Sequence, residues 1–325
     1  MIAYPNWVYE FTITPNITKK WTTELQGVVK VQSIADIKDI YFQSMEIAKI
    51  YLPSEIIYYL NCLTLLDYVN LVIIRGLPTN IDINHIGLSI ADIALLGCSE
   101  LCGSVITYDE EPDGIIQNVK TNYKSINIST GIKGKQAIDY HIEADFLSHI
   151  DESIVPECLS FLGIVNNNHI QTKFLRIIDI VRLLSENDIL NLQKNEFQIS
   201  PPQILGQIPN SLINIPVLSE DKIGSMIILA SPNATLGINS IAQSSLDKLR
   251  ITINQFSQQN YFSIPIKPGV GVFFNQNRVL HARDTVIGMR WLKRAFILRE
   301  IDLLPPHILA AKNIRSFSLN KLLIK

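Results

Sequence analysis

The chain has 325 residues, with 28 Lys and Arg against 30 Asp and Glu, so its formal net charge is −2. A nearly balanced charge argues against nucleic acid and membrane surfaces as partners, since both usually require a basic face. Apolar residues make up 47% of the chain and charged residues 18%, which is enough for a large core and too little charge for disorder. The most apolar segment, 56–74, is interrupted by Asn61, Asp67 and Asn70, so no transmembrane helix is expected.

The N-terminus and the cysteines indicate the compartment. The first residues, MIAYPNWVYEF, lack the basic region and apolar run of a secretory signal. The four cysteines, Cys62, Cys98, Cys102 and Cys158, are too few for a disulfide framework. Cys98 and Cys102 would share one helix face, but no further soft ligand is near them in sequence, so we interpret them as small buried residues. We expect a cytoplasmic globular protein.

The N-terminal third of the chain is mostly predicted as helix. Helices are expected over 34–52, from about residue 53 onward and over 86–101. The segment 71–78, LVIIRGLP, is short and β-branched and is stopped by a glycine and a proline, so it predicts a buried strand.

Beyond residue 103 the pattern changes to short extended segments separated by turn residues. Helices are expected here over 171–184 and 238–259. This order predicts an α+β fold with a rolled, jelly-roll-like β core flanked by helices. No repeat or linker marks a boundary, so we expect one domain: a helical part over about 1–103, a β core over about 104–300 and a closing segment over 301–325.

His141 and Glu143 form the first candidate metal motif. They are two residues apart in the extended segment AIDYHIEADF, so both side chains are expected on one face of a strand. A second histidine from elsewhere would complete a two-histidine, one-carboxylate triad that leaves open positions on a metal. Taken alone, an H-x-E pair also arises on strands by chance.

A further histidine stands beside several arginines in the C-terminal part. A Pro-Gly turn, a strand and a second turn at 275–277 lead to His281, which is expected on the next strand. Arg283, Arg290 and Arg294 follow it. Guanidinium groups bind carboxylates through two parallel hydrogen bonds, so these arginines could hold an anionic cosubstrate next to a metal.

Taken in order, these motifs resemble the clavaminate synthase-like Fe(II)/2-oxoglutarate oxygenases, in particular the bacterial hydroxylases of arginine, asparagine and lysine. The resemblance covers about residues 70–300, and it implies a double-stranded β-helix core of the jelly-roll or cupin kind. H-x-E in place of the commoner H-x-D is typical of this branch. The matching segments are Arg75-Gly76-Leu77-Pro78, Ile115–Val119, Ser129-Thr130-Gly131, His141-Ile142-Glu143, Cys158–Phe161, Thr172, Pro268-Gly269, Asn277–Arg283 and Arg290–Arg294.

The resemblance implies a metal and a cosubstrate site. His141, Glu143 and His281 would be the ligands of Fe(II), with 2-oxoglutarate and O2 as cosubstrates. Arg290 would pair with the distal carboxylate of 2-oxoglutarate. The hydroxyl of Thr172 would support the same carboxylate, although Thr172 is alternatively an ordinary helix cap.

The resemblance also implies a substrate pocket. Arg294 would receive the α-carboxylate of the substrate, and Gln117 and Glu143 would contact its α-amino group. Ser129 or Thr130 would line the same pocket.

Two departures from the family pattern concern the anions and the substrate. The loop between His281 and Arg290 is shorter than in the hydroxylases, which leaves open whether Arg290 and Arg294 exchange their anions. The family's arginine hydroxylases carry acids after a strand that corresponds to 225–230, where this chain reads SMIILASPNATLG. A guanidinium buried there would remain unpaired, so arginine is disfavoured as a substrate, and lysine or a neutral polar amino acid is favoured.

Acidic residues elsewhere could change that preference. Glu220, Asp221 or the segment 109–114, DEEPDG, could supply the missing acid. We interpret 109–114 either as a lid whose acids meet a cationic substrate tail or as a solvated turn rich in Asp, Pro and Gly.

Three functions therefore stay open. The first is hydroxylation at C3 or C4 of a free L-amino acid, in specialised metabolism. The second is oxidation of a carrier-bound aminoacyl group or a peptide, with a carrier protein as partner in the former case; desaturation in place of hydroxylation also stays open. The third is a metal-binding β-barrel protein without catalytic activity.

Overall fold

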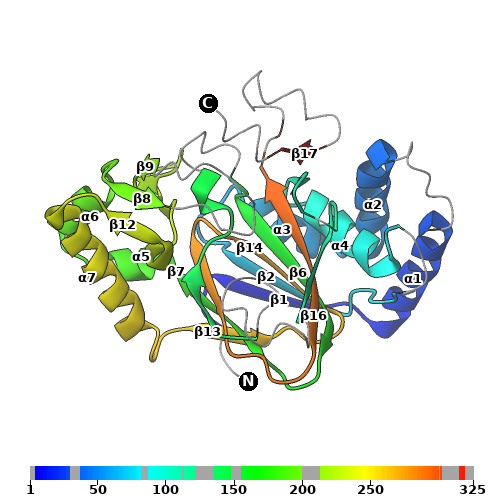
Figure 1. The fold of residues 1–325 in the computed structure, drawn as a ribbon. Helices are drawn as coiled ribbons and strands as arrows, with labels where there is room; N and C mark the ends of the chain where they lie inside the picture. The colour runs from blue at the N-terminus through cyan, green and yellow to red at the C-terminus, as the bar shows by residue number, and fades with distance from the viewer. Residues whose placement is uncertain are drawn as a thin grey trace.

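The structure is a computed structural model that describes residues 4–29, 37–81, 87–111, 113–121, 135–147, 155–199, 213–299, 301 and 315–318. A large sheet crosses the centre of the molecule, with α1, α2 and α4 on one side and α5, α6 and α7 on the other (Figure 1). The described helices are α1 (Pro15–Val29), α2 (Ile37–Tyr51), α3 (Ser54–Cys62), α4 (Ile90–Glu100), α5 (Ile177–Val181), α6 (Glu186–Leu192) and α7 (Ser240–Phe256). None of them is long and apolar enough to cross a bilayer.

The central sheet has eight strands, in the order β1-β2-β14-β6-β16-β3-β17, and β4 also pairs with β16. Antiparallel pairs join β2, β14, β6 and β16, whereas β1 and β2 run parallel. The strands are β1 (Val8–Thr12), β2 (Leu71–Arg75), β3 (Ser104–Tyr108), β4 (Gln117–Lys120), β6 (Cys158–Asn166), β14 (Val270–Asn275), β16 (Arg290–Leu298) and β17 (Ser316–Phe317).

A second, four-stranded antiparallel sheet carries the candidate histidines. Its order is β13-β7-β15-β5. Its strands are β5 (Ile138–His141), β7 (Gln171–Arg176), β13 (Phe262–Pro265) and β15 (Val279–Arg283). Five shorter strands form two small sheets, one with the order β12-β8-β9 and one with β10-β11. They are β8 (Phe197–Ile199), β9 (Ile213–Ile215), β10 (Leu218–Glu220), β11 (Met226–Ile228) and β12 (Thr235–Gly237).

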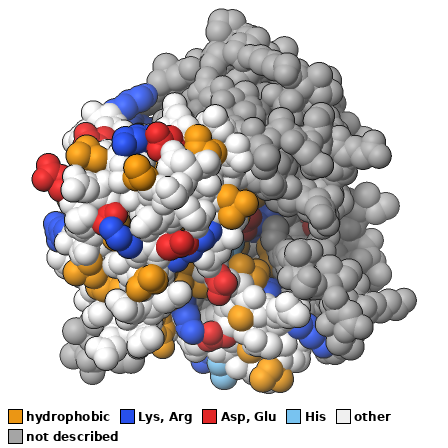
Figure 2. All heavy atoms as spheres, turned by 60° about the vertical axis from the view of Figure 1, so that its left-hand side comes forward, with side chains coloured by type: hydrophobic (Ala, Val, Ile, Leu, Met, Phe, Trp, Pro, Cys, Tyr) orange, Lys and Arg blue, Asp and Glu red, His pale blue; other side chains and the backbone are white. Residues whose placement is uncertain are grey.

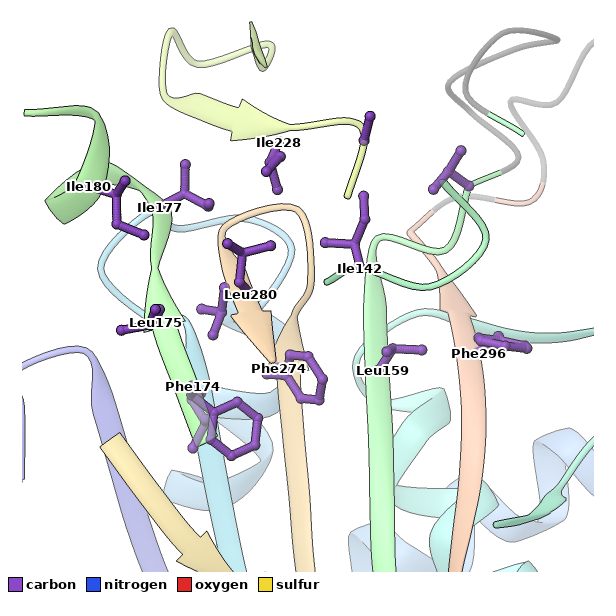
Figure 3. Close-up of a cluster of buried hydrophobic side chains, with 14 of the residues drawn as sticks. Ile142, Leu159, Phe174, Leu175, Ile177, Ile180, Ile228, Phe274, Leu280 and Phe296 are labelled. Carbon is purple, nitrogen blue, oxygen red and sulfur yellow. The ribbon is translucent and has the colours of Figure 1, made fainter. Parts of the chain in front are cut away.

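The central sheet is buried on both faces because its side chains alternate between two cores. In β2, Ile73 belongs to the core shared with the four-stranded sheet, and Ile74 belongs to the core under the N-terminal helices. In β14, Phe274 and Phe273 divide in the same way. Figure 3 shows the first core, where side chains from the two sheets point toward one another, among them Phe174, Leu280, Phe274, Leu159 and Phe296.

The charged side chains of strand β16 also alternate between the two faces of the sheet. Lys293 faces the helical side, where its Nζ lies 2.8 Å from the Asp92 carboxylate of α4. Asp92 also accepts hydrogen bonds from Ser89, which caps α4. Arg290 and Arg294 are an odd number of residues away from Lys293, and they face the other side of the sheet, where they line a cavity. The buried ion pair thus fixes β16 against α4, with the two arginines directed at the four-stranded sheet.

The face opposite the N-terminal helices is formed by α6, α7 and the small sheets. Figure 2 shows acidic and basic side chains interspersed over it, with apolar side chains scattered between them. Scattered apolar residues are usual on protein surfaces, and they do not indicate a docking surface.

The structure corrects the predicted helix over 171–184. Residues 171–176 form strand β7, and the helix α5 covers only Ile177–Val181. Strand β7 has partners on both edges, β13 and β15, so paired backbone groups override the weak helical periodicity of the segment. Thr172 therefore does not cap a helix.

Several other predictions are confirmed at the level of elements. The fold is mixed, with helices and strands as expected, and 71–75 and 279–283 are buried strands. The strand β1 was not predicted, and with β2 it joins the central sheet from within the part expected to be helical. All four cysteines are free and buried. Burial raises the pKa of the Cys98 thiol, which fits an inert packing residue.

Candidate functional site

The structure brings His141, Glu143 and His281 together. His141 ends β5 and pairs directly with His281 in the neighbouring strand β15. Each histidine Nε2 lies 3.9 Å from the same oxygen, Oε1 of Glu143. One ligand atom from each residue can be chosen so that all three lie within 4.8 Å of one another. Two imidazoles and one carboxylate in this arrangement fit a divalent iron site.

Long-range hydrogen bonds hold the backbone around Glu143. The Gln276 side chain, fully buried, accepts from the Glu143 N–H at 2.7 Å and donates to the Glu143 carbonyl at 3.2 Å. The Ser231 hydroxyl makes the same two kinds of contact, both at 3.1 Å, with the backbone of Ile142. The next residue, Ala144, has φ +57°, a conformation that requires such support. Sequence reasoning missed Gln276 and Ser231, because neither belongs to a chemical motif.

His281 and Glu143 have the protonation states that metal binding requires. Burial lowers the pKa of His141, but its contacts with Glu143 raise it more, so its pKa lies above the usual 6.5 in the absence of a cation. Burial and the adjacent His141 hold the pKa of His281 well below its usual 6.5. Burial alone would raise the pKa of Glu143, but Arg294 and the two histidines lower it by a larger amount. The net shift of the Glu143 pKa is therefore downward. Glu143 is therefore a carboxylate and His281 is neutral at pH 7. The Nδ1 of His141 lies 2.7 Å from the Asp139 carbonyl, which orients this imidazole.

Arg290 forms a cationic end of the site. Its side chain is 4% exposed, and its Nη2 donates to the Thr172 hydroxyl at 3.0 Å. Among the described residues, no carboxylate pairs with it, and its Nε has no hydrogen-bond acceptor. Burial, together with the cation of Arg283, lowers the pKa of Arg290 from 12.5 to about 9. A buried guanidinium with a hydroxyl beside it and no counter-ion fits an anion site.

Arg294 lies four residues further along β16 and has different partners. Its Nη1 donates to Glu143 at 2.6 Å, and its Nε donates to the Gln117 side chain at 2.7 Å. Its Nη2 also lies 3.5 Å from the carboxylate of Glu111. The ring of Phe296 covers the guanidinium, with a distance of 4.4 Å from Cζ to the ring centroid. Two carboxylates therefore contact Arg294, whereas none of the described acids pairs with Arg290.

The metal-cluster residues, Arg290 and Arg294 line one cavity. Its lining is Val119, Ile138, His141, Glu143, Phe161, Thr172, His281, Ala282, Arg283, Arg290 and Arg294. The candidate metal triad, the Arg290 end and the Arg294 end thus open onto the same space.

The remaining candidates from the sequence divide into three groups. Ser129 and Thr130 lie outside the described residues. Asp221 makes an ion pair of 2.5 Å with the buried Arg278, and Glu220 is exposed. In the segment 109–114, Glu111 is not a solvated turn residue, because it is partly buried and reaches Arg294.

No protein-family model matches the chain, and no curated protein matches it. Solved structures, in contrast, match the chain over most of its length. An asparagine oxygenase in complex with Fe(II), 2S,3S-3-hydroxyasparagine and succinate has a TM-score of 0.76 and 17% identity, over 95% of this chain and 99% of its own. The non-heme iron oxygenase OrfP in complex with Fe, succinate and (3S)-hydroxy-L-Arg has a TM-score of 0.78 and 17% identity, over 95% and 99%. OrfP in complex with Fe and alpha-ketoglutaric acid has a TM-score of 0.73 and 18% identity, over 90% and 95%. The chain therefore has the fold of these oxygenases, in agreement with the resemblance of its motifs.

Proposed function

We propose that this chain is an Fe(II)- and 2-oxoglutarate-dependent oxygenase that hydroxylates C3 or C4 of a free L-amino acid. The observation that carries the proposal is one cavity that contains both a two-histidine, one-carboxylate cluster and a buried arginine without a carboxylate partner among the described residues. The two sheets that enclose this cavity would form the double-stranded β-helix of the shared fold.

His141, Glu143 and His281 would hold Fe(II). The ion, when bound, supplies the activation of O2 that is coupled to decarboxylation of 2-oxoglutarate. The protein would position the reacting groups and exclude water. Phe161 and Phe274 serve this purpose, because their rings lie 5.9 and 5.2 Å from the imidazole of His281 and cover it with apolar surface.

Arg290 and Thr172 would anchor the distal carboxylate of 2-oxoglutarate. The contacts support this assignment over the exchanged one. Arg290 makes no ion pair with a described acid, and Thr172 adds a hydroxyl beside it. The distal carboxylate of 2-oxoglutarate would therefore be accommodated there. Arg294 already contacts two acids, and a dianion bound beside them would be repelled.

Arg294 and Gln117 would receive the amino-acid substrate. The asparagine oxygenase is solved with a hydroxylated asparagine and OrfP with a hydroxylated arginine, which supports free amino acids as the substrate class. Arginine itself stays disfavoured, because strand β11 and its continuation carry no acid and Asp221 is paired with Arg278. Lysine or a neutral polar amino acid is the expected substrate.

An anaerobic titration tests the proposal. Fe(II) is added to protein with 2-oxoglutarate, and the weak visible charge-transfer band of the chelate is recorded. The parent is expected to give the band, and both His141→Ala and Arg290→Met are expected to lose it. The twenty L-amino acids are then supplied with O2, and one of them is expected to couple succinate formation to a gain of one oxygen atom. A band without any coupled amino acid would favour a carrier-bound or peptide substrate. Absence of the band in the parent would refute the oxygenase assignment.

A further inference from the structure

The turn between β14 and β15 carries the side chain that holds the backbone of Glu143. Four residues, 275–278, form this turn, and a 3.2 Å hydrogen bond from the Arg278 N–H to the Asn275 carbonyl closes it. Gln276 lies at its second position, fully buried, and its amide bonds to both the N–H and the carbonyl of Glu143. The position of the turn therefore influences where the carboxylate of the candidate metal cluster lies.

The two ends of the turn are anchored in different ways. At the first end, Asn275 makes two neutral hydrogen bonds of 3.1 Å, from its N–H to the Asn70 carbonyl and from its side-chain amide to the Leu63 carbonyl. At the last end, the side chain of Arg278 is a buried cation, and its Nη2 donates to Asp221 in the loop between β10 and β11. The Nε and Nη1 of Arg278 have no acceptor among the residues that the structure describes. Asp221 is therefore the acid that compensates this cation within the described part of the chain.

Asp221 is itself fixed in its loop. Its Oδ1 accepts hydrogen bonds from the N–H groups of Ile223 at 3.0 Å and Ser225 at 2.9 Å, while its Oδ2 contacts Arg278. The side chains of Arg278 and Asp221 are 7% and 17% exposed, so water screens their attraction only weakly. Loss of one member of such a pair leaves the other as an uncompensated buried charge, which favours a shift of its backbone toward water.

We propose that Asp221 is a positioning residue for the metal site. Through Arg278 it holds one end of the turn 275–278. The turn in its place holds the Glu143 backbone through Gln276. Asp221 is absent from the residues that line the cavity, so its effect on the metal is indirect. This inference rests on the proposed function, because the metal ligands are those assigned there.

The test measures the affinity for Co(II), which suits the same nitrogen and oxygen ligands as Fe(II) and reports its coordination through its visible bands. Competition with a chelator gives the dissociation constant, at a temperature well below the Tm of every variant. Asp221→Asn is expected to bind Co(II) about tenfold more weakly than the parent, with altered visible bands, as is typical when a group that orients a metal ligand is disturbed. Asp221→Glu keeps the charge and is expected to recover part of the affinity.

A double-mutant cycle separates this role from a general loss of stability. If Asp221 acts through Gln276, then Asp221→Asn should weaken Co(II) binding by less than about twofold in the Gln276→Leu background, whereas independent effects would multiply. Asp188→Asn is the matched control, because it removes the same charge from another ion pair, the 2.8 Å contact with Lys248 that joins α6 to α7. It should lower the Tm and keep the Co(II) affinity of the parent.

Three results would overturn the inference while Co(II) binding by the parent still supports the metal site. They are unchanged affinity in Asp221→Asn, an equal loss in Asp188→Asn, and a loss that persists in full in the Gln276→Leu background. If Asp221→Asn does not fold, the cycle is run with Asp221→Glu, where a loss of about threefold that vanishes with Gln276→Leu is expected and no loss would refute the inference. If the parent binds no Co(II), the proposed metal site fails, and the inference fails with it.

Discussion

Replacing Arg290 with methionine is expected to stabilise the ligand-free protein and to abolish its response to 2-oxoglutarate. Arg290 is 4% exposed, its guanidinium donates to one hydroxyl, and it has no carboxylate partner among the described residues. Among the residues that the structure describes, nothing neutralises this buried charge, whereas a bound carboxylate would. Methionine has a similar length, lacks the charge and suits the apolar lining.

The magnitude follows from the pKa of Arg290. Burial and Arg283 lower this pKa from 12.5 to about 9, and each unit corresponds to about 1.4 kcal/mol, so the charged form is disfavoured by about 5 kcal/mol. Apolar replacements of buried charges recover only part of such a cost, about 1–4 kcal/mol. We expect a gain of about 2 kcal/mol, which corresponds to a rise in Tm of about 4 °C at about 2 °C per kcal/mol.

The assay is thermal unfolding with and without 2-oxoglutarate. At 100 times its Kd, 2-oxoglutarate should stabilise the parent by about 2.7 kcal/mol, and at the same concentration it should leave Arg290→Met unchanged. The control is Arg176→Met, because the Arg176 guanidinium lies 2.6 Å from its partner Asp179 and its loss should not stabilise the protein. A lower Tm for ligand-free Arg290→Met would refute the reasoning, since it would mean that the chain itself compensates the charge.

Gln276→Leu should lower the affinity for Fe(II) by about 10- to 100-fold in a competition with a chelator, because it removes the amide that holds the Glu143 backbone. For Asp221, burial raises the pKa, but the hydrogen bond from its arginine partner lowers it more, so the net pKa lies below the usual 3.8. Its stabilising effect is therefore complete above about pH 4 and lost as the pH falls through the lowered pKa; urea unfolding of the parent and Asp221→Asn should show a constant difference from pH 7 to 5 and a shrinking one below pH 4. Gly163→Ala should lower the free energy of unfolding by about 3 kcal/mol or more, since its Cβ would lie 2.0 Å from the backbone oxygen of Lys267. Gly27→Ala, with nothing within 4 Å of its Cβ, should be neutral or stabilising.

The metal cluster could be predicted because its chemistry is local. The spacing of His141 and Glu143 correctly suggested that the two side chains share one site. The expected strand, however, ends at His141, and Glu143 lies in the bend that follows it. The ordered set of motifs then linked them to His281. What the sequence does not contain is the support of these residues, because the contacts of Gln276 and Ser231 join segments that are about 90 or more residues apart and follow no periodic pattern.

Thr172 and Glu111 show two further features that could not be predicted from the sequence. Apolar spacing around 171–184 fits a helix, but strand partners on both edges decide the structure of its first part. Among the described residues of 109–114, composition correctly marks turns at 109–110 and 113–114. The contact of Glu111 with Arg294 joins residues that are 183 positions apart in the chain, which composition does not reveal.

Strand β5 has a consequence for metal exchange. It stands at the edge of the four-stranded sheet and pairs with β15 through two residue pairs, with an irregularity in register between them. Edge strands with few hydrogen bonds open locally at a lower free energy than the whole domain. Such fraying would separate His141 from His281 while both cores stay packed, so iron could enter and leave without global unfolding. Loading with metal should then appear as slower amide hydrogen exchange along β5, while exchange in the central sheet remains unchanged.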